Sequence, residues 1–200
     1  MKIDYLETAF LERSIAMSNL AMSTTFPSNK NQMKKLYKKQ IKCCKGLGSS
    51  KIGSGHDNFL NGIIVRFVLT ATNKFWTEFQ RYHFAEFVTS QSTMHRAKNM
   101  DFGFIINEYV TDEIRDIIVR YQKEYNENPT ESRYMKLLYN LPSGIEISAD
   151  IVTNYRQLKT MITQRKDHKL KEWRDFCGYM IEELPMFSEL TGFKKQNTGY

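Results

Sequence analysis

Two stretches of this 200-residue chain contain the side chains best suited to bind a charged ligand, residues 56–96 and residues 154–165. Their candidates are two histidines, a serine, an asparagine and two arginines: His56, His83, Ser92, Asn154, Arg156 and Arg165. An arginine guanidinium is a planar fork of donors that grips a phosphate or a carbonyl edge through paired hydrogen bonds. These residue types therefore indicate binding of a phosphate-bearing or carbonyl-bearing ligand.

Metal chemistry is not indicated by the remaining candidate ligands. The chain has four histidines and three cysteines, with no CxxC pair and no HExxH arrangement. Cys43, Cys44 and Cys177 are odd in number and fit neither a disulfide framework nor a zinc site. We therefore expect three free thiols and no bound metal.

Charge and hydropathy limit the class of protein. A net charge of +7 and a pI near 9.2 favour an anionic partner, which can be a nucleotide, the phosphates of a cofactor or a nucleic acid. No run of about 18 apolar residues is present, so we expect no membrane span. The opening MKIDYLETAF does not resemble a signal peptide, and we expect a cytoplasmic protein.

The candidate residues must be positioned by a mixture of helices and a few strands. Apolar and β-branched runs predict strands, and apolar residues at helical spacing predict helices. The predicted strands are residues 2–8, 62–70 and 145–152. The predicted helices are residues 11–22, 32–44, 73–88, 111–126, 130–139, 154–165 and 170–184. The composition and this order predict an α+β fold, one domain over residues 1–200 with a small buried sheet flanked by helices.

The predicted helix over residues 32–44 has a strongly basic face. Seven lysines lie between Lys30 and Lys45, opposite apolar residues at helical spacing. Such a face can contact a phosphate backbone. A solvated helix face is the preferred interpretation, because no recognisable nucleic-acid-binding motif accompanies it. Nucleic acid stays an alternative partner.

The order of these segments resembles the flavin-dependent thymidylate synthases (ThyX). In that family a His-rich loop, H-E-x-x-x-E-H, leads into a strand, a helix and the signature R-H-R-x7-S. His56 falls on the first His of the loop, His83 on the central His of the signature and Ser92 on its Ser. The run TNYRQLKTMITQR matches the family's N-x-R-x-L…R through Asn154, Arg156, Leu158 and Arg165.

The resemblance implies an α+β homotetramer that binds FAD and dUMP at sites shared between subunits. Reduced flavin in such enzymes passes a one-carbon unit from methylenetetrahydrofolate to the pyrimidine, with NADPH as a further co-substrate. It implies nucleotide binding by Ser92, Arg156 and Arg165, and cofactor binding by His56, His83 and Asn154. Because the cofactor carries the chemistry, no catalytic residue is assigned.

The chain departs from the family pattern at cationic positions. Tyr82 and Phe84 replace the two signature arginines, and Gly62 replaces the second His of the loop. Arg81 and Arg96 are basic residues beside the signature that can compensate. Each lost charged hydrogen bond is worth about 1.5–3 kcal/mol. The alternatives are therefore a non-catalytic nucleotide-binding or partner-binding protein on the same scaffold, and a basic nucleic-acid-binding module.

Each matched residue also has an ordinary structural interpretation. His83 can be a core histidine between two aromatic residues, and Ser92 a polar turn residue. Arg156 and Arg165 can be surface arginines of a solvated helix, and His56 a loop hydrogen-bonding group.

Overall fold

The computed structural model describes residues 1–195. They form four strands: β1 (Lys2–Ala9), β2 (Ile64–Thr72), β3 (Glu86–Ser90) and β4 (Glu146–Asn154). The α-helices are α1 (Leu11–Met17), α2 (Lys30–Gln40), α3 (Cys43–Gly48), α4 (Asn73–Phe79), α5 (Thr93–Arg96), α6 (Asp112–Glu127), α7 (Glu131–Tyr139), α8 (Tyr155–Arg165), α9 (Lys171–Glu183) and α10 (Phe187–Thr191). Short 3-10 turns are η1 (Leu20–Met22), η2 (Asn58–Gly62) and η3 (Ala97–Asn99).

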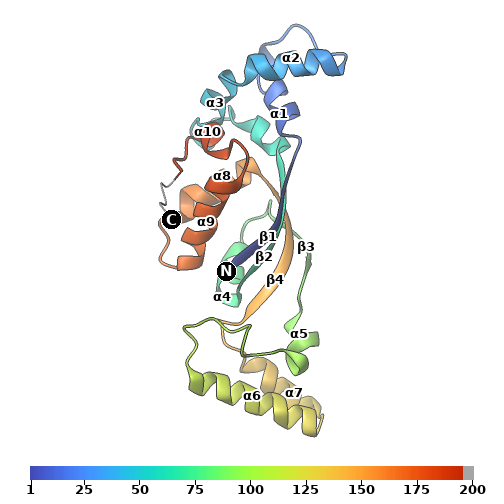
Figure 1. Cartoon of the computed structure of the whole chain (residues 1–200), viewed down its shortest axis with the longest axis vertical. Helices are drawn as coiled ribbons and strands as arrows, with labels where there is room; N and C mark the ends of the chain where they lie inside the picture. Colours follow the sequence, from blue (N-terminus) through green and yellow to red (C-terminus); the bar gives the residue numbers. More distant parts are fainter. Residues whose placement is uncertain (196–200) are drawn as a thin grey trace. The chain divides into compact units, whose positions relative to one another are not determined.

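The four strands form one sheet in the order β1-β2-β4-β3, shown in Figure 1. The Tyr155 N–H donates to the Ile63 carbonyl at 3.1 Å, and the Asn73 N–H donates to the Ile145 carbonyl at 2.8 Å. Because the partner's number falls as the number along β2 rises, β2 and β4 are antiparallel. This sheet with its helices confirms the predicted α+β class.

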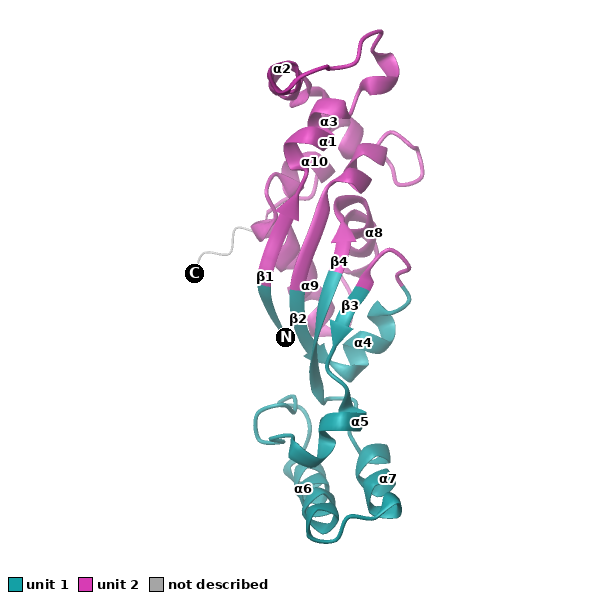
Figure 2. Ribbon diagram, turned by 90° about the vertical axis from the view of Figure 1, so that its right-hand side faces the viewer, with its two compact units in different colours: residues 1–4, 68–81, 87–151 teal, residues 5–67, 82–86, 152–200 magenta. Residues whose placement is uncertain are grey.

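The described chain divides into two compact units, coloured separately in Figure 2. Unit 1 consists of residues 1–4, 68–81 and 87–151. Unit 2 consists of residues 5–67 and 82–86 and of the chain from residue 152 on. Each of the four strands has residues in both units. A single domain over residues 1–200 therefore stays a prediction.

Unit 1 has an aromatic core and a smaller helical one. Trp76 lies 5.2 Å from Phe87 and 5.4 Å from Phe79 between ring centroids, and its indole N–H donates to the Ile147 carbonyl at 3.0 Å. A second apolar cluster includes Ile118 of α6 and Leu137 of α7. Trp76 and Phe79 are buried, and Phe87 is half-buried against them.

Unit 2 packs α8 and α9 around the other end of β2. Phe67 of β2 lies 6.0 Å from Phe176 of α9, and Phe176 lies 5.9 Å from Trp173. Leu158 and Ile162 of α8 are completely buried. This packing fixes the rotation of α8, the helix that carries the candidate arginines.

The predicted helix over residues 73–88 is wrong beyond its first two turns. Helix α4 ends at Phe79, and Glu86–Ser90 form strand β3 instead. The Thr153 hydroxyl donates to the Phe84 carbonyl at 2.9 Å, so the chain is already held beside β4 before β3 begins. Phe87 joins the aromatic core from this strand, where its spacing from Phe79 imitates two helical turns.

Smaller differences concern helix ends. The predicted helix over residues 11–22 stops at Met17, and that over residues 32–44 is divided into α2 and α3. The chain after Pro185, which lacks a clear pattern, still contains α10. Buried Phe187 and Leu190 hold this short helix, so long-range packing rather than local periodicity forms it.

Candidate functional site

Helix α8 begins with a capped N-terminus. The Asn154 side chain accepts a hydrogen bond from the Gln157 N–H at 2.9 Å, and Asn154 has the extended conformation of an N-cap residue. The open N–H groups of the first turn carry partial positive charge. Asn154 therefore has a local structural role in addition to its predicted role in cofactor binding.

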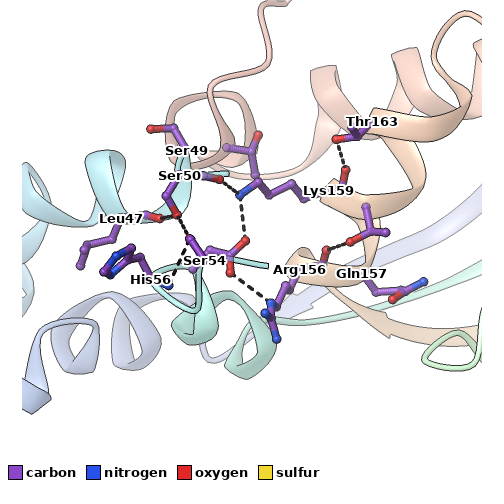
Figure 3. Close-up of polar contacts among 12 residues, drawn as sticks. Leu47, Ser49, Ser50, Ser54, His56, Arg156, Gln157, Lys159 and Thr163 are labelled. Atoms are coloured by element: carbon purple, nitrogen blue, oxygen red, sulfur yellow. Dashed lines mark hydrogen bonds and ion pairs between the residues drawn. The ribbon is translucent and has the colours of Figure 1, made fainter. Parts of the chain in front are cut away.

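Arg156 and Lys159, one turn apart on α8, share one carboxylate. Arg156 Nε donates to Asp57 Oδ1 at 3.1 Å, and Lys159 Nζ lies 2.8 Å from Asp57 Oδ2. Lys159 Nζ also donates to the Ser50 carbonyl at 2.6 Å. Figure 3 shows Arg156 and Lys159 reaching from α8 towards the loop that contains Ser50 and Ser54.

The burial of this cluster makes it more than a surface ion pair. The Asp57 side chain is 1% exposed and that of Lys159 is 5% exposed, whereas that of Arg156 is 31% exposed. Two cations face one anion, so the group carries a formal net charge of +1. Arg156 is the member that reaches solvent, and it can present that excess charge to an anion.

A pocket of about 500 Å³ lies beside Arg156. Its lining comes from the start of α8, the η2 turn, the loop before it and the turn before β3: Ile52, Gly53, Asn61, Phe84, Asn154, Arg156, Gln157 and Thr160. The lining combines a guanidinium, three carboxamides and an aromatic ring. Phe84 is 69% exposed, so its ring is available for stacking.

Arg165 at the far end of α8 is held by aromatic residues. Its Nε donates to the Tyr82 hydroxyl at 3.0 Å, and that hydroxyl donates to Gln164 Oε1 at 2.9 Å. The guanidinium carbon lies 5.1 Å from the Trp173 ring centroid, within cation–π range. Tyr82, at the first signature arginine position of the ThyX resemblance, therefore contacts Arg165 directly.

The structure does not bring Arg156 and Arg165 to one contact point. They are nine positions apart on one α-helix, which separates them by about 13.5 Å along the axis and places them on opposite sides of the helix. Their different partners, Asp57 and Tyr82, agree with this separation. A role for both in nucleotide binding stays a prediction, and Arg156 is the one that lines the pocket.

His56 and His83 both have exposed side chains in unit 2. The His56 backbone N–H donates to Ser54 Oγ at 3.4 Å. His83 lies in the turn between α4 and β3. The interpretation of His83 as a core histidine is therefore wrong, while cofactor binding by either histidine stays a prediction.

Ser92, Arg81 and Arg96 belong to unit 1. Ser92 is half-buried and precedes α5, where its carbonyl accepts from the Arg96 N–H at 3.2 Å. Arg81 is exposed. One terminal nitrogen of Arg96, Nη1, is buried without a hydrogen-bond partner among the described residues. The compensating role of Arg81 and Arg96 stays a prediction.

Sequence reasoning missed Asp57 and Lys159 as members of this site. Lys159 lies between Leu158 and Met161, both buried, so its position on the inward side of α8 was visible from spacing. Its partner was not visible, because Asp57 precedes it by 102 residues. The sequence signal was therefore a lysine on an apolar helix face that required a carboxylate.

Other groups were searched over the same residues. Within residues 1–195 no cluster of three potential metal ligands occurs. The cysteines are free, with Cys44 and Cys177 buried and Cys43 exposed. Within that range, every helix is too short or too polar to cross a membrane.

Comparison with known proteins gives no match by sequence and clear matches by structure. No family model matches the chain, and no curated protein sequence does. A crystal structure of the flavin-dependent thymidylate synthase ThyX from Helicobacter pylori, complexed with FAD and dUMP, is similar with a TM-score of 0.66 and 15% identity. The similarity covers 96% of this chain and 98% of that one.

A second Helicobacter pylori ThyX structure, also with FAD and dUMP, gives a TM-score of 0.64 at 15% identity. It covers 96% of this chain and 97% of the other. At this identity the likeness concerns the fold and leaves ligands and activity open. The α+β chain described here therefore has the fold of flavin-dependent thymidylate synthase ThyX along nearly its whole length.

Proposed function

We propose that this protein binds a pyrimidine deoxynucleotide such as dUMP, together with FAD, as a divergent flavin-dependent thymidylate synthase without the signature arginines. The observation that supports this most is Arg156. It lines a pocket, and the similar solved structures are complexes with FAD and dUMP. Arg156 and Lys159 together carry one more positive charge than Asp57 neutralises.

The pocket suits a planar heterocycle that carries a phosphate. Arg156 and the N-terminus of α8 attract an anion, and Phe84 offers a ring face to a base or flavin. Asn61 and Gln157 can donate to or accept from ring carbonyl and imide groups. These donors fit FAD as well as dUMP, and Asn154, Arg156 and Gln157 are the residues that would hold a phosphate of either.

In the catalytic form of this proposal, FAD supplies the electron-transfer chemistry, with methylenetetrahydrofolate as one-carbon donor and NADPH as reductant. The protein's residues bind and orient the pyrimidine and stabilise charge on it. Arg156, which lines the pocket, and Arg165 are the candidates on α8.

A non-catalytic binding protein is the second candidate. It is favoured by the Tyr82–Arg165 hydrogen bond, because an arginine that is held by a tyrosine hydroxyl and an indole face is restrained from following a substrate. On this alternative the pocket beside Arg156 binds a nucleotide and no turnover follows.

Calorimetric titration with dUMP and with FAD tests the binding proposal. Arg156→Ala should reduce the binding free energy of the ligand that occupies the pocket by about 1.5–3 kcal/mol, which is roughly a tenfold to hundredfold loss of affinity. Arg120→Ala is the matched control, since Arg120 is a 62% exposed arginine on α6, and it should leave affinity unchanged. Absence of binding of both ligands to the wild type would reject the proposal.

Turnover separates the two candidates. Formation of dTMP from dUMP, with methylenetetrahydrofolate, NADPH and added FAD, supports the enzyme. Binding of dUMP without dTMP formation supports the binding protein. The assay should include excess FAD, because Tyr82 and Phe84 supply no cation and we expect FAD to dissociate during purification.

We also propose that the chain assembles as a homotetramer, in which subunits share ligand sites. Light scattering at micromolar concentration should give about four times the 23.6 kDa mass of one chain. A monomer mass, with and without dUMP and FAD, would reject the shared-site arrangement while leaving the pocket beside Arg156 to be tested alone.

A further inference from the structure

Positive charge is concentrated in one segment of the chain. Residues 13–56 contain eight lysines and one arginine and no aspartate or glutamate, a formal charge of +9. The whole chain has 29 basic and 22 acidic residues, so the remainder has 20 basic and 22 acidic ones, a charge of −2. The net charge of +7 is therefore the sum of one strongly basic segment and a nearly neutral remainder.

Helix α2 carries most of this charge on its exposed side. We define the α2 lysine surface as five lysines of the helix and the one that follows it: Lys30, Lys34, Lys35, Lys38, Lys39 and Lys42. All six are exposed. At 100° per residue they occupy about half of the helix circumference. Figure 2 shows α2 at one end of unit 2.

The opposite side of α2 is used by the protein itself. Met33, Leu36 and Tyr37 are half-buried, and α2 packs against α1. The Tyr37 hydroxyl lies 3.8 Å from the sulfur of Met186 in unit 2. The helix is therefore held by its apolar side while the lysine surface faces solvent.

Regular spacing makes this surface suitable for a polyanion. Lys30, Lys34, Lys38 and Lys42 follow one another at four-residue intervals, which is about 6 Å along the axis for each step and about 18 Å in total. A nucleic-acid strand carries a phosphate about every 3.4 Å of duplex axis. Several phosphates can therefore meet this row of ammonium groups at the same time.

A solvated face does not require this arrangement, as α6 of the same chain shows. There the exposed basic residues alternate with acidic ones, and Arg120–Glu124 and Lys123–Glu127 are ion pairs four residues apart. On α2, residues four positions apart, such as Lys34 and Lys38, are both lysines, and this like-charge repulsion destabilises the helix. From residue 13 to residue 56 no carboxylate is available to relieve this repulsion.

We propose that the α2 lysine surface binds nucleic acid through its phosphate backbone, independently of the nucleotide pocket beside Arg156. The chemistry recognised is a chain of closely spaced phosphates, without base contacts. An anionic membrane surface is less suited, because a helix that lies in a membrane interface inserts its apolar side and that side of α2 packs against the protein.

The test compares two variants of the full chain with equal charge. The surface variant is Lys34→Gln with Lys35→Gln, Lys38→Gln and Lys39→Gln. The control is Lys2→Gln with Lys74→Gln, Lys123→Gln and Lys171→Gln, whose lysines are exposed and form ion pairs with nearby carboxylates. Both change the net charge from +7 to +3. Glutamine is a good helix former, so α2 should remain folded in the surface variant.

Fluorescence anisotropy with labelled single-stranded DNA, single-stranded RNA and duplex DNA, over about 50–200 mM salt, measures the affinity and its salt dependence. The surface variant should bind single strands about a hundredfold more weakly at the lower salt. Its slope of log K against log salt should be smaller by about three, since each neutralised contact contributes about 0.7. The control should bind like the wild type.

Equal losses in both variants would overturn the proposal, because they would show a response to net charge alone. No binding by the wild type at the lowest salt would also overturn it. Binding to phosphatidylserine vesicles without binding to any of the three nucleic acids would assign the surface to membranes instead. None of these outcomes depends on whether dUMP or FAD binds.

Discussion

The Tyr82 hydroxyl accepts a hydrogen bond from Arg165 Nε at 3.0 Å. The ThyX resemblance expects an arginine at position 82, and the tyrosine there instead restrains an arginine of α8. A tyrosine at position 82 therefore does more than remove a cation. Its hydroxyl also restrains the guanidinium of Arg165.

Restoring the signature arginine should destabilise the protein unless an anion is present. Tyr82→Arg removes the acceptor of Arg165 and places a second guanidinium beside it, a loss of about 1.5–3 kcal/mol in the free energy of unfolding. Thermal denaturation of Tyr82→Arg with Phe84→Arg should show this loss without ligand and its recovery with FAD or dUMP.

Tyr82→Phe is the control for this experiment. It removes the hydroxyl without adding charge, so ligands should not selectively recover its stability. If FAD stabilises the double variant no more than it stabilises Tyr82→Phe, the restored arginines do not contact the cofactor, and the binding-protein candidate is favoured.

The shared carboxylate should be essential for stability. Asp57→Asn leaves Lys159, whose side chain is 5% exposed, beside a neutral amide, which should cost about 3–5 kcal/mol. Urea denaturation measures this difference. Asp4→Asn is the control, because Asp4 pairs with a 72% exposed Lys2 and an exposed pair contributes only about 0–1 kcal/mol.

Combining Asp57→Asn with Lys159→Met should recover part of the loss, since the unpaired buried cation is then removed. A double variant no more stable than Asp57→Asn would show that the bond to Arg156 matters more than the one to Lys159.

Two glycines of α3 should respond in opposite directions to alanine. A Cβ at Gly48 would lie 2.2 Å from the Leu190 carbonyl oxygen, which is backbone and must move, so Gly48→Ala should destabilise by about 1–3 kcal/mol. A Cβ at Gly46 would meet nothing within 4 Å, and Gly46→Ala should stabilise by about 0.5–1 kcal/mol. Equal effects in urea denaturation would contradict the close packing of α3 against α10.

Alkaline pH should destabilise the fold partly through Cys177. Burial raises the pKa of this thiol from 9.0 to about 12. Below about pH 9 the thiol is protonated in both states, so its contribution to stability is complete. Above that pH only the unfolded chain ionises, and stability is lost as pH rises towards 12, by about 1.4 kcal/mol for each pH unit.

Denaturation from about pH 8 to about pH 10.5 measures this slope. Cys177→Ala should make it shallower, whereas Cys43→Ala, at an exposed cysteine, should not. Burial also raises the pKa of Tyr155, so a smaller loss should remain in Cys177→Ala. Identical slopes in both cysteine variants would exclude the thiol as the cause.

The helices with a clear periodic pattern of apolar residues were predicted correctly. Helices α6, α7, α8 and α9 lie within one or two residues of their predicted limits, because their apolar residues recur on one side over several turns. The helix prediction for residues 80–88 was wrong. Phe79 of α4 and Phe87 of β3 contact each other in one core, and their spacing of eight residues also fits a single helix.

The candidate site was predictable only in its separate parts. Arg156 and Asn154 were assigned through their match to the N-x-R motif of the ThyX family, and both line the pocket. The bonds from Asp57 to Arg156 and Lys159 join residues about a hundred positions apart, and no local pattern specifies such a pair. Arg156 and Arg165 were both assigned to one nucleotide, and the partners that hold them apart, Asp57 and Tyr82, required the fold.

The uneven distribution of charge along the chain also means that the isoelectric point does not describe how the protein meets a charged resin. A protein with this pI is expected to leave a cation-exchange column as the buffer approaches pH 9.2. Here we expect retention to be governed by the segment of residues 13–56, which has nine basic and no acidic residues. The protein should therefore remain on the resin above its isoelectric point, oriented with α2 against the matrix.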